Sequence, residues 1–387
     1  MKNRRNDWFQ ILTYIGLQLI VIAAAFLAGY YAHRMIILPG GDFPQLTQAY
    51  QLMKEHAYDP LPSDGLMENG MIRGMLQVYN DPYTVLIDPP QAELQNDQLS
   101  GKFGGIGVRI EKDTLGDYRL FPFPDSPAAS SGILEGDLLT GINELLITRE
   151  TPIDNIEAEI RGPVGSVVEI SYLRLSETES QTVKVTRKEI GLPSVTYHLV
   201  PERPDVGIVQ LNVVADTSPK EITDAMRDLM GRGAQFFILD LRNNPGGLVD
   251  AGVRVARLFL TNGDVLQEQY KGQDIQTFSV EAVGEFANAP LVVLVNNNTA
   301  SAAEIVAGAI QGQQRAELIG SVTYGKDSVQ LVFDLKDRTS LHITSARWWI
   351  PGLELPRKGQ GLQPDILLTP EQASGNEAVL AALEQFK

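Results

Sequence analysis

Ser301 and Lys326 are the two side chains of this sequence whose types and setting could support nucleophilic catalysis. The apolar run over 291–295 predicts a buried strand, and the small residues over 302–310 predict a helix. We therefore expect Ser301 where the strand passes into the helix. A hydroxyl there would lie at the positive end of the helix dipole, beside free backbone N–H groups. Lys326 is expected in a loop before the strand 329–333, where a neutral amine could take the serine proton.

Both residues also fit ordinary structural roles. Ser301 followed by Glu304 and an apolar run is a capping-box pattern, and an exposed loop position is the usual one for a lysine. Base chemistry would require the pKa of Lys326 to fall from about 10.4 toward ~7–8, which burial can achieve. Gln330 could orient the amine, and the N–H of Ala302 could stabilise the oxyanion formed when the serine attacks a carbonyl group.

Composition excludes several other chemistries. The chain has no cysteine, so thiol catalysis, disulfides and thiolate-bound zinc are excluded. None of its four histidines stands at a metal-ligand spacing from another, and we expect no metal or other cofactor. His198, expected in a connector, and His342, expected within a strand, are the candidates for a serine–histidine pair. A net charge of −16 argues against nucleic-acid binding, which needs a basic surface.

The N-terminal segment predicts a membrane anchor. Lys2, Arg4 and Arg5 precede an uncharged apolar run over 11–31, and a helix needs roughly 20 residues to cross a bilayer. Basic residues before the run predict a single-pass protein of the cell membrane with a cytoplasmic N-terminus and an extracytoplasmic body. A cleaved signal peptide, whose apolar core is usually shorter, is the alternative. A cytosolic enzyme is a third interpretation.

The texture of the chain predicts a multidomain α+β protein. Expected domains are an N-terminus with a transmembrane helix (1–40), a small helical lead-in (41–98), a β-rich domain (99–190), an α/β domain (191–372) and a C-terminal helix (373–387). In the lead-in, apolar spacing predicts two helices, over 43–57 and 65–79, that pack on each other. From Val206 onward strands alternate with helices, which indicates an α/β domain.

Within the β-rich domain, residues 100–190 resemble a PDZ domain. The match rests on three segments, 104–107, 126–129 and 135–137. In that family a glycine loop presents backbone N–H groups to the C-terminal carboxylate of a peptide, which adds to the sheet as a strand. The resemblance implies that Gly105, Ile106 and Gly107 bind the carboxylate. A glycine-rich hairpin without a ligand is the alternative.

After the membrane segment, nearly the whole chain resembles the carboxyl-terminal processing (tail-specific) proteases of the S41 serine peptidase family. The resemblance rests on four segments, 241–247, 300–305, 323–330 and 359–365. It implies a ClpP/crotonase-like protease domain with Ser301 as nucleophile, Lys326 as base and Gln330 as the residue that orients the lysine. The N–H groups of Gly246 and Ala302 would then form the oxyanion hole. It also implies that substrates are proteins or peptides bound by their C-termini, and that the lead-in and C-terminal helices build a homodimer.

The sequence departs from that family at two places. Asp327 replaces the usual glycine after Lys326, where a carboxylate could hold the lysine charged, and 298–300 replaces a glycine-serine-alanine start. Asp327 also ends the similarity of 320–326 to a phosphate-binding P-loop, which continues with Ser or Thr. The sequence thus predicts a membrane-anchored extracytoplasmic serine endopeptidase that cleaves proteins near their C-termini. The alternative is a PDZ-bearing scaffold with an inactive protease domain.

Overall fold

The computed structural model describes residues 43–174, 177–337, 339–353 and 360–386. The predicted membrane helix over 11–31 lies outside these residues. Within the described ranges, no helix is both long enough and apolar enough to cross a membrane. The described part of the chain divides into two compact units between Glu68 and Asn69.

The two expected lead-in helices form, but they bury no side chain. They are α2 (Pro44–His56) and α3 (Asp64–Tyr79). None of the residues in either helix is buried, and the expected packing of the pair stays a prediction. Two short amphipathic helices offer too little apolar surface to form a core alone. A further helix, α4 (Pro89–Ser100), follows in a stretch for which none was expected.

Residues 102–191 form the expected β-rich region. Its main sheet has the order β3-β4-β5-β7-β8 with β6 on β5, while β2 and β9 pair separately. The strands are β2 (Lys102–Gly105), β3 (Val108–Lys112), β4 (Tyr118–Pro122), β5 (Asp137–Ile142), β6 (Leu145–Leu146), β7 (Val167–Leu173), β8 (Gln181–Thr186) and β9 (Lys188–Gly191), and the helices are α5 (Pro127–Ser130) and α6 (Ile153–Ile160). Alternate residues of β7, such as Val168 and Ile170, face a separate core. The PDZ resemblance of this region stays a prediction.

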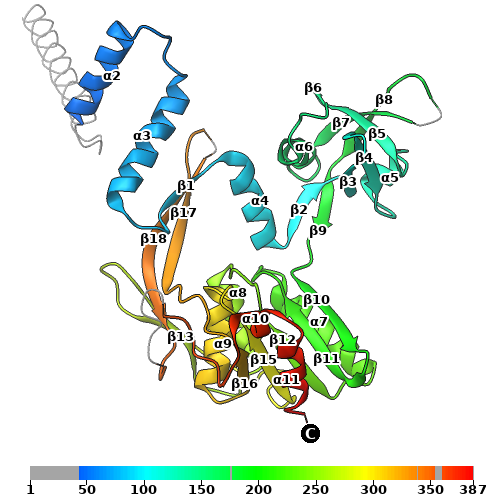
Figure 1. The fold of residues 1–387 in the computed structure, drawn as a ribbon, viewed down its shortest axis with the longest axis vertical. Helices are drawn as coiled ribbons and strands as arrows, with labels where there is room; N and C mark the ends of the chain where they lie inside the picture. The colour runs from blue at the N-terminus through cyan, green and yellow to red at the C-terminus, as the bar shows by residue number, and fades with distance from the viewer. Residues whose placement is uncertain (1–42, 175–176, 338, 354–359, 387) are drawn as a thin grey trace, which may run out of the picture. The chain divides into compact units, whose positions relative to one another are not determined.

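A six-stranded sheet of order β10-β11-β12-β15-β16-β19 organises the α/β region (Figure 1). The strands are β10 (Val195–Val200), β11 (Arg203–Leu211), β12 (Phe236–Asp240), β15 (Leu291–Val295), β16 (Glu317–Gly320) and β19 (Ile366–Leu367). The helices are α7 (Ser218–Gly231), α8 (Val249–Arg257), α9 (Ala302–Gly312), α10 (Pro370–Ser374) and α11 (Glu377–Leu383). From β11 to β19 all neighbours are parallel, and β10 is antiparallel to β11. The expected C-terminal helix corresponds to α11, and α10 precedes it.

Continuous apolar strands allow helices to cover both faces of this sheet. Phe237 and Leu239 of β12 face the core that also holds α7, α8 and α9, whereas Ile238 faces a smaller core with α11. In β15 the alternation is the same, and all five of its residues are buried. Strands of a parallel sheet that is covered on both sides read as unbroken apolar runs, which is why the sequence reveals them.

A second sheet supplies the other wall of the site. Its order is β1-β18-β13-β14, with β17 also paired to β18. The strands are β1 (Val85–Ile87), β13 (Asp264–Tyr270), β14 (Gln276–Ser279), β17 (Ser328–Asp334) and β18 (Ser340–Trp349). Val85 of β1 pairs with His342 of β18, and Gln330 of β17 pairs with Thr344. Pairing with β18 therefore brings the segment before β1 to the loop that carries Lys326.

Candidate active site

Three loops meet at the carboxyl edge of the parallel sheet. They follow the adjacent strands β12, β15 and β16, and carry Gly246, Ser301 and Lys326 respectively. Open parallel sheets bind ligands outside the carboxyl ends of their strands, because the loops there converge. The three predicted segments, far apart in sequence, therefore belong to one site.

Ser301 occupies a strained turn between β15 and α9. It is the N-cap of the helix, with φ 54° and ψ −121°, and is 9% exposed. Positive φ is uncommon for a residue other than glycine and costs energy that the surroundings must supply. The expected capping contact is present, since the N–H of Ser301 donates to Glu304 Oε2 over 2.8 Å. Capping and nucleophile placement therefore use the same turn.

The residues before Ser301 are tied to both neighbouring loops. Thr299 Oγ1 donates to the carbonyl of Leu241 over 2.9 Å, and the N–H of Ala300 donates to the carbonyl of Asn244 over 2.9 Å. The N–H of Tyr324 donates to the carbonyl of Thr299 over 2.9 Å. Within 298–300, where the sequence departs from the family pattern, Thr299 thus anchors the segment through its side chain.

Gly246 lies directly against the nucleophile turn. Its φ is 99°, and a Cβ there would stand 2.7 Å from Ser301 Cβ and 3.0 Å from the nitrogen of Ala302. The Gly246 N–H donates to Asn244 Oδ1 over 2.9 Å, so it already has an acceptor. Among the described residues, the N–H groups of Ala302 and of Gly247 have no acceptor. Gly247 belongs to the segment 241–247 that carries the family resemblance, but it was not among the residues predicted to form the oxyanion hole.

Lys326 is partly buried, and its amine is hydrogen-bonded to Gln330, the residue that the resemblance implied for orienting it. Its Nζ donates to Gln330 Oε1 over 2.8 Å, and the Gln330 amide nitrogen donates to the carbonyl of Tyr83. Nζ also lies 5.0 Å from the centre of the Tyr83 ring. No hydrogen bond joins Ser301 Oγ to Lys326 Nζ in the part of the chain that the structure describes.

Burial lowers the pKa of Lys326 below its ordinary value, while the negative charges of Asp81 and Glu304 act in the opposite direction. Asp327 does not join them, because its carboxylate pairs with Arg347 of β18. The carboxylate of Asp327, which could otherwise hold Lys326 charged, is therefore paired with Arg347 instead. The net shift favours the neutral amine that a general base requires.

Comparison with known proteins agrees with this geometry. A model of peptidase family S41 matches residues 205–368. The carboxy-terminal processing protease CtpA of Bacillus subtilis (strain 168) is 32% identical over 325 residues, covering 84% of this chain and 68% of that protein. The carboxyl-terminal-processing protease of Picosynechococcus sp. (strain ATCC 27264 / PCC 7002 / PR-6) is 36% identical over 302 residues, covering 77% and 72%. The chain belongs to the carboxyl-terminal processing proteases of peptidase family S41.

This S41 chain is accordingly a serine peptidase. Among solved structures, a photosystem II D1 C-terminal processing protease is similar to it, with 27% identity and a TM-score of 0.46, over 88% of this chain and 90% of that chain.

Three residues of the S41 site were not identified as functional from the sequence. Asp81 and Tyr83 were not singled out, and Glu304 was interpreted only as part of a helix cap. The structure places Tyr83 against Lys326, and burial, followed by a hydrogen bond with Tyr324, raises the pKa of Tyr83 to about 12. The sequence offered one clue to Asp81 and Tyr83: they belong to the segment 81–84, which immediately precedes the short apolar run of β1.

Neither histidine candidate is bonded to the serine. His198 is exposed within β10, where it pairs with Ile208, so its expected place in a connector is wrong. The pairing of β10 with β11 imposes the strand despite its polar side chains. His342 lies in β18 as expected, and its Nε2 is 3.1 Å from Ser340 Oγ. Among the described residues, no group of three or more His, Asp or Glu could hold a metal.

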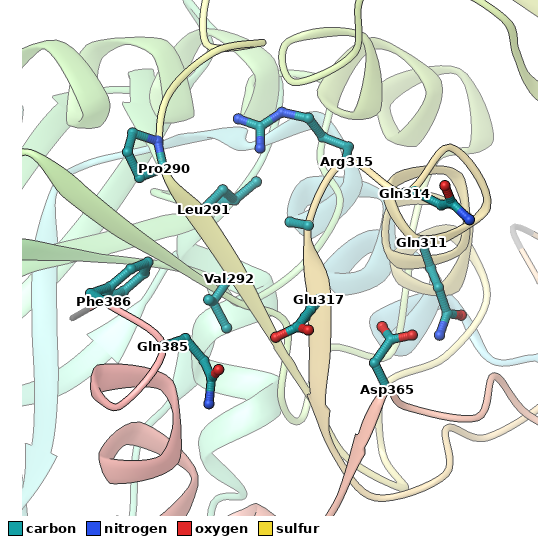
Figure 2. A pocket seen from close by; sticks show the side chains of 11 residues that line it. Pro290, Leu291, Val292, Gln311, Gln314, Arg315, Glu317, Asp365, Gln385 and Phe386 are labelled. Carbon is teal, nitrogen blue, oxygen red and sulfur yellow. The ribbon is translucent and has the colours of Figure 1, made fainter.

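A pocket of about 510 Å³ lies away from this S41 site (Figure 2). Its lining includes Leu291 and Glu317, the first residues of β15 and β16, so it opens at the amino edge of the sheet. Arg315 beside it donates to the carbonyls of Phe259 and Phe286, each over 3.0 Å. None of the predicted site residues lines this pocket.

Gly105, Ile106 and Gly107, the residues expected to bind a carboxylate, are all buried. The side chain of Ile106 lies in the core of the β-rich region, and Gly107 has φ 68°. The N–H groups of Ile106 and Gly107 have no acceptor within the described residues. Successive free N–H groups are the feature that an anion nest requires.

Proposed function

We propose that this chain is a membrane-anchored, extracytoplasmic endopeptidase that cleaves proteins near their C-termini with a dyad of Ser301 and Lys326. The observation that carries the proposal is the setting of Lys326. Its amine is partly buried and donates to the neutral amide of Gln330, while its loop is bonded to the nucleophile turn through Glu304. A lysine in such a setting can be neutral when the hydroxyl must lose a proton.

In the proposed reaction, neutral Lys326 accepts the Ser301 Oγ proton as Oγ attacks the carbonyl carbon of the substrate. The bond to Gln330 uses one N–H of the amine and leaves its lone pair for this proton. The oxyanion is stabilised by the N–H of Ala302, and by Gly246 once its bond to Asn244 is exchanged. Lys326 then protonates the leaving amine, and water activated by the same lysine hydrolyses the acyl-serine.

The dyad is tested with full-length protein in membrane vesicles and an unfolded peptide substrate. We expect Ser301→Ala and Lys326→Ala to abolish cleavage. Lys326→Arg is the matched control, because it keeps a positive charge but cannot lose its proton, so it should also be inactive. Cleavage at the wild-type rate by any of the three variants would refute the dyad.

We further propose that the region 99–190 binds the C-terminal carboxylate of the substrate through Gly105, Ile106 and Gly107. The unpaired N–H groups of Ile106 and Gly107 support this. Amidating the C-terminus of a peptide substrate should raise KM and leave kcat nearly unchanged. Acetylating its N-terminus should change neither KM nor kcat. Equal KM for the free and amidated peptides would contradict this role.

The membrane anchor over 11–31 rests on the apolar run and on Lys2, Arg4 and Arg5 before it. We expect the protein in the membrane fraction after a high-salt wash, with its body accessible only to proteases on the extracytoplasmic side. Digestion only from the cytoplasmic side would show that the body lies in the cytoplasm and would contradict the proposed topology. The scaffold alternative relied on Asp327, which pairs with Arg347 and so no longer supports it.

A homodimer through the lead-in helices is a further part of the proposal. Leu46, Leu52 and Met53 of α2 are between 45% and 49% exposed, which leaves an apolar stripe for a partner copy. Sedimentation of the detergent-solubilised protein should give a dimer, and Leu52→Glu should shift it to monomer. A monomeric wild-type protein would exclude this assembly.

A further inference from the structure

Glu304 is a fully buried carboxylate in the first turn of α9, with 0% exposure. Its Oε2 accepts from the N–H of Ser301 over 2.8 Å and from the N–H of Lys326 over 3.0 Å. Its Oε1 accepts from Thr323 Oγ1 over 2.6 Å and from the N–H of Gly325 over 2.7 Å. A helix cap requires only the first of these four bonds.

The other three donors belong to the lysine loop. One side chain therefore bridges the backbone of the nucleophile and the backbone of the base, on segments that follow different strands, β15 and β16. We propose that Glu304 is a positioning residue that holds Ser301 and Lys326 in register and whose negative charge tunes the base. This inference rests on the proposed dyad.

The donor set requires acceptor oxygens. Three of the four donors are backbone N–H groups, which cannot accept, and Thr323 Oγ1 itself accepts from the N–H of Leu362 over 2.7 Å. A glutamine at position 304 would direct an NH₂ group at one of these pairs and leave donors facing each other. Since buried donors without acceptors are costly, the two loops would separate in that variant.

The charge of Glu304 has a second effect, because it is one of several titratable groups that face Lys326. The others are Asp81 and Tyr83 from the segment before β1, and His342 from β18. Asp81 and Glu304 raise the pKa of the amine against the lowering by burial. Removing the charge at position 304 therefore lowers the pKa of Lys326 and increases the neutral fraction at a given pH.

The two effects separate in the pH profile of kcat for the full-length protein. Glu304→Gln should lower kcat on the order of 10²-fold with KM little changed, because misplacing reacting groups by about 1 Å costs that much. Its acidic limb should move to lower pH. Glu304→Asp keeps the charge but is one methylene shorter, so kcat should fall while the limb stays in place. A merely structural role would lower stability and move no limb.

Asp137→Asn is the matched control for loss of a buried carboxylate. Asp137 is 2% exposed and pairs with Arg174 in the β-rich region. It should lower the melting temperature with the pH limb unchanged. Lys326→Ala is measured alongside, because activity there would refute the dyad itself.

Suppose that Lys326→Ala is inactive but that Glu304→Gln has the kcat and the acidic limb of the wild type. That result would overturn the role of Glu304 and leave the dyad intact. If Glu304→Gln does not fold at the assay temperature, Glu304→Asp decides. A reduced kcat at a melting temperature close to that of the wild type supports the inference; a wild-type kcat, or a kcat that falls only together with the melting temperature, overturns it.

Discussion

Gln330 presents its carbonyl oxygen to Lys326 because its other end is committed to Tyr83. The Gln330 amide nitrogen donates to the carbonyl of Tyr83, an atom that can only accept, so Oε1 is left to face the amine at 2.8 Å. The carbonyl of Tyr83, which is distant from Gln330 in the sequence, thereby fixes the orientation of the Gln330 side chain toward Lys326. Both contacts leave Lys326 beside a neutral group rather than a carboxylate.

Replacing Gln330 should therefore alter the base in two distinguishable ways. Gln330→Ala removes the acceptor of Nζ and should lower kcat on the order of 10²-fold. Gln330→Glu places a carboxylate beside Nζ, which raises the pKa of Lys326 and moves the acidic limb of the pH profile to higher pH. Initial rates of peptide cleavage, measured over a range of pH, give both the kcat of Gln330→Ala and the acidic limb of Gln330→Glu. A limb that moves downward in Gln330→Glu would contradict this arrangement.

The lowered pKa of Lys326 also predicts how stability depends on pH. Because the folded pKa lies below 10.5, folding disfavours the ammonium, and stability rises as pH increases through the window between the folded and the ordinary pKa. Lys326→Met should be more stable than wild type below this window and equal to it above. Urea unfolding at several pH values measures the difference, and a constant difference would be inconsistent with a lowered pKa.

Gly246→Ala should displace the nucleophile. The new Cβ would stand 2.7 Å from both Ser301 Cβ and the carbonyl oxygen of Ala300, in addition to the cost of a positive φ, about 1–3 kcal/mol. Gly233→Ala is the matched control, since its φ of 101° is nearly the same but no atom lies within 4 Å of the new Cβ. We expect both to lose stability and only Gly246→Ala to lose activity. Equal activities in the two variants would rule out the close packing.

The pairing of Asp327 with Arg347 predicts that Asp327→Asn remains active within about fivefold, because an ion pair of this exposure is worth about 0–1 kcal/mol. Arg347→Gln should be the more harmful change. It releases the carboxylate of Asp327, which then raises the pKa of Lys326 and moves the acidic limb to higher pH. The double variant Asp327→Asn/Arg347→Gln should return the acidic limb to its wild-type position. If the limb stays shifted, the effect comes from the loss of Arg347 and not from the freed carboxylate of Asp327.

Local pattern alone determined the elements that carry the site. The apolar run 291–295 is β15 without change, and the helix expected over 302–310 is α9, Ala302–Gly312. Both faces of the parallel sheet are covered, so a strand such as β15 is an unbroken apolar run, and the short length of the run favours a strand over a helix. The motifs also predicted Ser301, Lys326 and Gln330 as site residues, because family resemblance is carried by short segments.

Tertiary structure alone decided the electrostatic setting of the base. Tyr83 reaches Gln330 across 247 positions because β1 pairs with β18, and Asp327 is neutralised by a residue 20 positions away on the same strand pair. Which carboxylate faces Lys326 depends on the order of strands and on side-chain direction. Neither is encoded in the spacing of a motif, so the sequence pointed to Asp327, whereas in the fold the charges of Asp81 and Glu304 are the ones that raise the pKa of the amine.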